Sequence, residues 1–266
     1  MNFFISLTIL ATEIFFMLKD IIISIQAYSK AHQFIQKYKL WKWIIIPGIV
    51  YCILFIIGMY FFGQTANGFI EWLKSLLLNS LNRINSSFLN FIVTLSGIML
   101  WVIMMLLYFS FFKYLFLIIG SPVFAYLSEK TAAILEGRDF PFSFSQLLKD
   151  IVRGVRIALR NALWQTVYLL SILLLGLIPL VGWFTPVLAI LIECYYYGFS
   201  MLDYSMERNK ISANRSIAYV ANHKGLAIGN GVVFYLMHLI PIIGWVLAPT
   251  YAVIAATLSI YDTKKV

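Results

Sequence analysis

The sequence predicts an all-α integral membrane protein with two long transmembrane helices, two Pro/Gly-broken helical hairpins that enter the membrane only partly, and amphipathic cytoplasmic helices. Of its 266 residues, 62% are hydrophobic and only 12% are charged, whereas a soluble domain is about 45–50% apolar and about 25% charged. In addition, one phrase occurs twice inside long apolar stretches, as LIPLVGWFTP at 177–186 and LIPIIGWVLAP at 239–249. We therefore expect a single membrane domain over 1–266 in which one broken element is duplicated.

The N-terminal region, residues 1–42, is predicted to form an amphipathic helix that lies at the membrane surface. Charged side chains interrupt its apolar sequence, namely Glu13, Lys19, Asp20 and Lys30. Residues 3–18 nevertheless remain a possible short span, so the sequence leaves open whether this region crosses the bilayer.

Residues 43–120 are predicted to form the two transmembrane helices. The apolar block 43–62 is long enough to cross a hydrocarbon core of roughly 30 Å, and a second block follows at 88–119. The segment 63–87 between them carries few Lys or Arg residues, so the positive-inside rule makes it the only sizeable exterior segment. The sequence GSP at 120–122 predicts a helix break.

Residues 121–162 predict cytoplasmic helices, the first ending at Gly137. Lys and Arg are frequent there and in 204–225, which favours the cytoplasmic side for both segments. The net charge of +9 therefore reflects topology rather than a nucleic-acid partner.

The duplicated hairpins are predicted at 163–203 and 226–262. Pro179, Gly182 and Trp183 recur 62 positions later as Pro241, Gly244 and Trp245, and the blocks close near Asp203 and Asp262. The first arm of each hairpin has about 14 apolar residues, or roughly 21 Å of helix, which is marginal for a crossing that needs roughly 20 residues. Partly inserted hairpins are favoured over two tight full-length hairpins, which remain the alternative.

Each predicted break begins a new helix inside an apolar stretch. A helix N-terminus carries roughly half a positive charge, and two such ends at membrane depth can hold an anion without a charged side chain. Gly182, Trp183, Gly244 and Trp245 are therefore candidate anion-pathway residues. The alternative is an ordinary proline kink between packed helices.

Charged side chains supply further candidates. Four cations follow one another at helical spacing, namely Lys149, Arg153, Arg156 and Arg160. Such a stripe can contact lipid headgroups or gather anions, and its central members Arg153 and Arg156 are the candidates for an anion pathway. Glu193 is an ionisable residue inside an apolar block, which makes it a candidate for proton coupling.

Other chemistry finds no support in the residue pattern. The chain has no GxxxxGK[ST], HExxH or GxSxG motif and no His/Cys cluster, and Cys52 and Cys194 sit in apolar runs. We therefore predict no enzyme, no cofactor and no metal site.

Several stretches in the same order resemble one family. They are WIIIPGI at 43–49, GSPVFAYLSEKTAAILEG at 120–137, KDIVRGVRIALR at 149–160, the two IPxxGW hairpins and the closing YDTKK at 261–265. Over roughly Ala27 to the C-terminus, the chain resembles the CysZ-type sulfate permeases, which share a domain with the eukaryotic etoposide-induced membrane proteins. The resemblance implies sulfate uptake for cysteine synthesis by a channel-like or proton-linked permease of the bacterial inner membrane, working as a homo-oligomer among lipids.

The resemblance also implies a sulfate site just before the first long helix, where the family has an Arg-Arg pair preceded by glycine. The matching positions here read KLWKW, so Lys39 and Lys42 are the candidate anion ligands, Trp41 replaces one arginine and lysine takes the place of the glycine. The rival interpretation is a non-transporting membrane scaffold or lipid-interacting protein.

Overall fold

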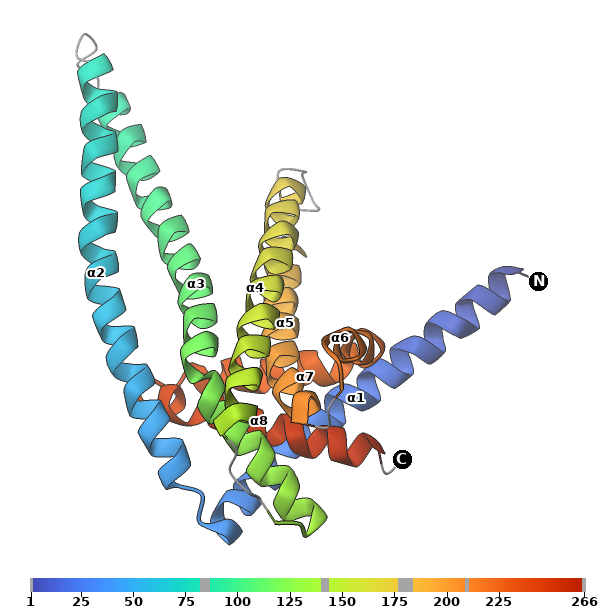
Figure 1. The fold of residues 1–266 in the computed structure, drawn as a ribbon. Helices are drawn as coiled ribbons and strands as arrows, with labels where there is room; N and C mark the ends of the chain where they lie inside the picture. Colours follow the sequence, from blue (N-terminus) through green and yellow to red (C-terminus); the bar gives the residue numbers. More distant parts are fainter. Residues whose placement is uncertain (1, 82–86, 140–143, 177–183, 209–210, 265–266) are drawn as a thin grey trace. The chain divides into compact units, whose positions relative to one another are not determined.

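The computed structural model describes residues 2–81, 87–139, 144–176, 184–208 and 211–264 (Figure 1). Within these ranges it contains helices and no strands, which confirms the predicted all-α class. The helices are α1 (Asn2–Tyr38), α2 (Lys42–Leu81), α3 (Ser87–Glu136), α4 (Phe144–Leu175), α5 (Thr185–Arg208), α6 (Ala213–Asn222), α7 (Lys224–His238) and α8 (Ile243–Lys264).

The chain divides into two compact units, residues 51–116 and the remainder. The smaller unit pairs parts of α2 and α3 through aromatic side chains. The Tyr51 ring lies 4.1 Å from that of Phe116, and the Tyr108 hydroxyl donates to the Phe55 carbonyl at 3.2 Å. Gly58 leaves room for this hydroxyl, because a Cβ there would lie 2.5 Å from it.

The predicted boundary at the end of the first long helix is wrong. We expected an apolar block at 43–62 and a loop over 63–87, but α2 continues without interruption to Leu81. Residues 63–81 include no proline, which is the residue that most strongly stops a helix, so the helix propagates through Gly63 and Gly68 once its first turns have formed.

The predicted helix break at GSP is also wrong, because α3 passes through Pro122. Proline cannot donate to the carbonyl four residues before it, here that of Ile118. The Ser121 hydroxyl donates to this same carbonyl at 2.8 Å, so the acceptor is satisfied and the helix persists. The helix ends at Glu136 as expected, and Gly137 follows with a positive φ of 63°.

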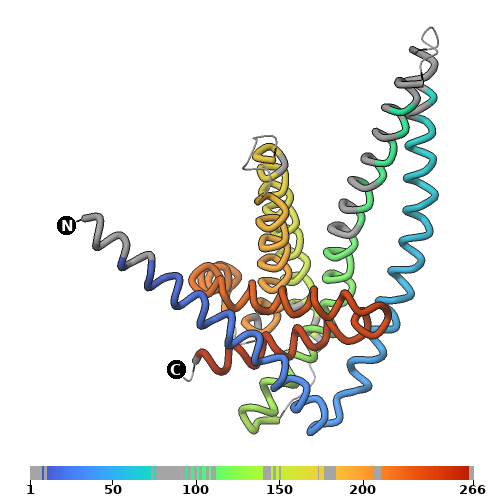
Figure 2. The backbone as a smooth tube through the Cα atoms, turned by 180° about the vertical axis from the view of Figure 1, so that it is seen from behind, coloured from blue at the N-terminus to red at the C-terminus, as the bar shows by residue number. Residues whose placement is uncertain are grey.

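The larger unit contains both predicted hairpins. In the two opposite views α4 and α5 lie side by side, α7 and α8 run across this pair, and α1 crosses α7 and α8 (Figures 1 and 2). The basic stripe from Lys149 to Arg160 does not lie on a separate helix, since it belongs to the first half of α4. The corresponding segment before the second hairpin is a separate helix, α6.

Glycine allows α7 to pack closely between α1 and α5. A Cβ on Gly198 would lie 2.0 Å from the Ala227 carbonyl oxygen, and one on Gly231 would lie 2.1 Å from that of Cys194. Such distances exclude any side chain, so backbone meets backbone at the crossing of α5 and α7. Small residues serve this purpose in membrane helix packing generally.

Three helices in the described part of the chain are long and apolar enough to cross a membrane. They are Lys42–Trp72, Thr185–Met206 and Ile243–Thr263. This result supports an integral membrane protein and places one candidate span in each hairpin.

Candidate functional site

Three polar pairs lie between the antiparallel helices α4 and α5, and we call these six residues the α4–α5 polar seam. The pairs are Gln165 with Glu193, Asn161 with Ser200, and Arg153 with Asp203. From residue 153 to residue 165 a helix rises about 18 Å. The same two helices expose apolar side chains elsewhere, including Leu163, Leu174 and Ile190. The seam therefore places polar groups between two helices whose outward faces carry apolar side chains.

Glu193 lies at one end of the seam and joins both hairpins. Its carboxylate accepts hydrogen bonds from the Gln165 amide of α4 and from the Tyr235 hydroxyl of α7, the latter at 2.9 Å. Gln165 is only 1% exposed. Glu193, which the sequence suggested for proton coupling, is therefore held by neutral donors from two neighbouring helices.

Asn161 occupies the middle of the seam and is completely buried. Its amide nitrogen donates to the Ser200 hydroxyl at 3.2 Å, and its oxygen accepts from the Arg160 guanidinium at 3.0 Å. The same guanidinium lies 5.6 Å from the centre of the Phe199 ring. A cationic side chain thus lies next to the buried amide of the seam.

The other end of the seam is an ion pair between Arg153 and Asp203, with a separation of 3.0 Å. Asp203 is 1% exposed, and it also accepts a hydrogen bond from Ser216 of α6. The Arg153 guanidinium donates in addition to the Ile211 carbonyl. Arg153, a candidate anion ligand, therefore fastens α4 to α5 and to the segment before α6.

The other basic candidates lie apart from this ion pair. Arg156 is exposed on α4, while Lys39 and Lys42 are exposed at the turn between α1 and α2. Lys39 has a φ of 53°, in the left-handed region that glycine adopts most easily. The lysine that the resemblance matches to the family's glycine thus lies at a turn with a glycine-like backbone conformation.

The turn of the second hairpin uses its own backbone groups. The amides of Ile243 and Gly244 donate to the carbonyls of Pro241 and Ile240 at 2.7 and 2.9 Å. Gly244 is needed there because a Cβ would lie 1.8 Å from the Met237 carbonyl oxygen. These two amides at the start of α8 are occupied by local acceptors, which is the behaviour of a packed turn.

Trp245 also binds within this turn, since its indole nitrogen donates to the His238 carbonyl at 3.0 Å. The corresponding candidates of the first hairpin, Gly182 and Trp183, lie outside the described residues. The structure therefore tests neither of them as anion ligands.

Sequence reasoning missed Gln165, Asn161 and Tyr235. The signal for the first two was present, because Arg153, Asn161 and Gln165 follow one another at multiples of four residues and so share one face of a helix. Nothing in the local sequence of α7 indicated that Tyr235 reaches Glu193, 42 residues away.

Comparison with known proteins identifies the family. The model of the family described as "Sulfate transporter CysZ/Etoposide-induced protein 2.4" matches residues 27–249, which is most of the chain. The chain belongs to this family. A protein named "Sulfate transporter CysZ" from Pseudomonas aeruginosa strain LESB58 is 32% identical over 143 residues, covering 53% of this chain. Another protein of that name, from Pseudomonas fluorescens strain Pf0-1, is 26% identical over 221 residues, covering 81% of this chain and 83% of the relative.

The chain spans 58% of the length of the Pseudomonas aeruginosa CysZ protein that it matches. The CysZ/etoposide-induced family match begins at residue 27, close to where the resemblance in the sequence begins. The description of this family names a sulfate transporter, which agrees with the prediction that the protein is not an enzyme.

Proposed function

We propose that this protein transports sulfate or a similar oxyanion across the bacterial inner membrane. The observation that carries the proposal is the match of the sulfate-transporter family to residues 27–249. The α4–α5 polar seam supports it, because ionisable groups inside a membrane protein are candidates for an ion pathway by default. Sulfate would feed cysteine synthesis, and we propose a homo-oligomer as the working form.

The proposed pathway has two parts. Lys39, Lys42 and Arg156 are exposed cations that would raise the local anion concentration. From there the anion would move along the seam past Asn161 and its neighbour Arg160. Glu193 would oppose an anion while ionised, so we propose that it takes up a proton during transport, which makes a proton-linked permease the favoured mechanism over a channel.

Transport can be tested with the purified full-length protein in liposomes. We expect uptake of radioactive sulfate well above that of empty liposomes. In Asn161→Leu the rate of uptake should fall about tenfold or more. A lost hydrogen bond to a charged group is worth about 1.5–3 kcal/mol, and 1.36 kcal/mol corresponds to a tenfold change in rate. Ser171→Leu is the matched control on the same helix, since Ser171 is exposed and bonds only its own helix at Val167. Equal uptake by both variants would exclude the seam, and uptake no greater than that of empty liposomes would favour the scaffold.

We also propose that α2 and α3 supply the two long transmembrane helices and that both hairpins enter the membrane only partly. The turn of the second hairpin supports this arrangement, because large apolar side chains there are exposed: Leu239 at 77%, Ile240 at 54%, Ile242 at 68% and Ile243 at 63%. In addition, α7 has 15 residues, or about 22 Å of helix. That length falls short of a crossing of roughly 30 Å.

The depth of the turn can be measured with spin labels in lipid nanodiscs. A label at Ile240→Cys should be quenched by lipid-soluble oxygen more than by a water-soluble nickel reagent, whereas a label at the exposed Asn222→Cys should show the reverse. A label at Ile240 that is fully accessible to nickel would mean that the hairpin either crosses the whole bilayer or lies outside it.

A further inference from the structure

Helix α1 docks on the second hairpin through side chains that follow one another along one face. Ser24 donates to the Leu226 carbonyl at 3.0 Å, and Tyr28 donates to that of Asn230 at 2.8 Å. Farther along α1, Lys30 forms an ion pair with Asp262 of α8 at 2.6 Å. These contacts attach α1 along α7 and to the end of α8.

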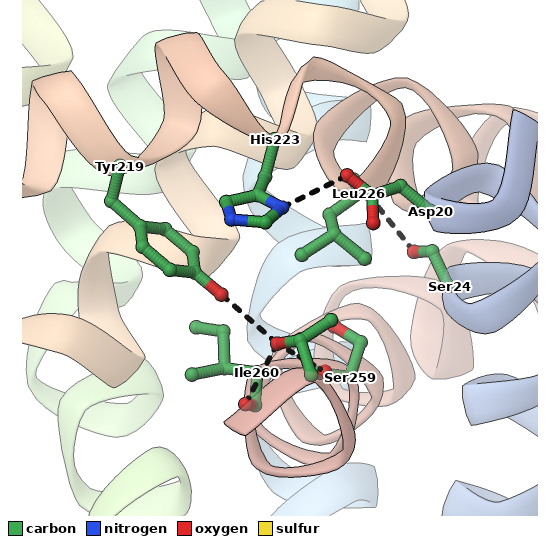
Figure 3. Close-up of polar contacts among 8 residues, drawn as sticks. Asp20, Ser24, Tyr219, His223, Leu226, Ser259 and Ile260 are labelled. Atoms are coloured by element: carbon green, nitrogen blue, oxygen red, sulfur yellow. Dashed lines mark hydrogen bonds and ion pairs between the residues drawn. The ribbon is translucent and has the colours of Figure 1, made fainter. Parts of the chain in front are cut away.

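The N-terminal end of this docked face is a contact between Asp20 and His223 (Figure 3). The Asp20 carboxylate lies 3.0 Å from Nδ1 of His223, a residue at the joint between α6 and α7. The carboxylate is nearly buried, but the imidazole side chain is 37% exposed. Protons from solvent can therefore reach the imidazole while its partner stays in place.

The backbones approach closely beside this contact. A Cβ on Gly225 would lie 2.2 Å from the Met17 carbonyl oxygen, and one on Gly229 would lie 2.8 Å from that of Ile21. The two glycines present no side chain to α1, so the backbone of α1 and the Cβ atoms of Asp20 and Ser24 lie directly against α7. Asp20–His223 and Ser24–Leu226 are the polar contacts that hold this stretch.

We propose that the Asp20–His223 contact is a pH-sensitive latch that holds the N-terminal half of α1 on the α6–α7 joint while the imidazole carries a proton and loosens when that proton is lost. Histidine is the side chain whose charge normally changes between pH 5 and 8. A protonated imidazole adds the attraction of an opposite charge to its hydrogen bond with the Asp20 carboxylate. The loss of one proton therefore weakens the contact without removing it from the structure.

Two ionisable side chains contact the imidazole, Asp20 on α1 and Tyr219 on α6. Lys224, the first residue of α7, follows His223 in the sequence. Tyr219, whose ring lies 4.6 Å from the imidazole, donates or accepts a hydrogen bond with Thr263. Burial raises the pKa of its phenol, and this effect outweighs the lowering by the Thr263 hydrogen bond, so Tyr219 stays neutral.

The Lys30–Asp262 ion pair limits the part of α1 that can move. This pair does not involve the imidazole, so it is retained when the latch loosens. The segment that undocks is therefore the part of α1 before Ser24, while the rest of the helix stays against α7 and α8.

The latch can be tested by measuring a distance, without any transport assay. The sample is the full-length protein in nanodiscs, with Cys52 and Cys194 replaced by alanine. Spin labels are attached at Leu18→Cys on α1 and Asn222→Cys on α6, which are both exposed positions. We expect one distance at pH 6 and a second, longer population at pH 8. A distance distribution that is the same at both values overturns the proposal, and this measurement needs no change to the latch itself.

Variants then assign the change to the latch. His223→Gln and Asp20→Asn keep hydrogen-bonding side chains of similar size but cannot form the charged pair, so each should abolish the pH dependence. His32→Gln is the matched control, because His32 is a histidine of α1 that is bonded to Tyr251 and Gln36 instead, and it should leave the dependence intact. Persistence of the dependence in His223→Gln, or its loss in His32→Gln, would also overturn the proposal.

Discussion

Replacing Gly198 by alanine is expected to lower the thermal midpoint of the purified protein by roughly 4–8 °C, which corresponds to about 2 kcal/mol. The added Cβ would lie 2.0 Å from the Ala227 carbonyl oxygen and 2.9 Å from the Ala227 Cα. Both atoms belong to the backbone of α7, so no side chain can rotate away, and the two helices must separate. Because α5 and α7 belong to different hairpins, the separation should also disturb the Glu193–Tyr235 contact.

The matched control for this change is Gly68→Ala. Gly68 lies inside α2, and a Cβ there would meet no atom within 4 Å. Alanine in a helix interior is more favourable than glycine by up to about 1 kcal/mol, so the control should be neutral or slightly more stable. The measurement is thermal unfolding in detergent followed by circular dichroism. Equal midpoints for both variants would show that α5 and α7 are not in close backbone contact.

Arg153→Ala should have the second large effect, and it should act on stability as well as on transport. Removing one partner of a buried ion pair typically costs about 3–5 kcal/mol, because the other charge is left buried. Here the remaining partner is Asp203, which is 1% exposed. We expect the thermal midpoint to fall by roughly 6–20 °C.

Two variants separate this explanation from a role in anion binding alone. Arg156→Ala changes an exposed arginine three residues along α4 and should leave the midpoint nearly unchanged. Adding Asp203→Asn to Arg153→Ala removes the uncompensated charge and should restore part of the lost stability. If Arg153→Ala lowers sulfate flux with no change in midpoint, Arg153 is an anion ligand rather than a structural partner of Asp203.

The ion pairs extend the internal duplication beyond the repeated phrase. The sequence showed that the hairpins close near Asp203 and Asp262, and the structure shows that each of these carboxylates is bound by a cation. Their partners differ, because Asp203 pairs with Arg153 of its own hairpin while Asp262 pairs with Lys30 of α1. In the second repeat, therefore, α1 provides the cation that α4 provides in the first.

The sequence by itself determined the class of this protein and its family, and it predicted the duplicated hairpins. Each of these depends on local properties, namely composition, the length of apolar runs and the order of short motifs, which can be read without knowing which residues meet. The end of α3 at Glu136 was predicted for the same reason, since glycine at the next position favours a helix end.

The tertiary structure decided what the polar side chains do. Pro122 does not break α3 because the Ser121 hydroxyl takes the acceptor that proline leaves, and Arg153 faces Asp203 rather than an open vestibule. Tyr235 meets Glu193 and Asp20 meets His223 across 42 and 203 residues of chain. Helical periodicity predicts which face of a helix a residue occupies, but the partner of that face depends on how helices far apart in the chain pack together.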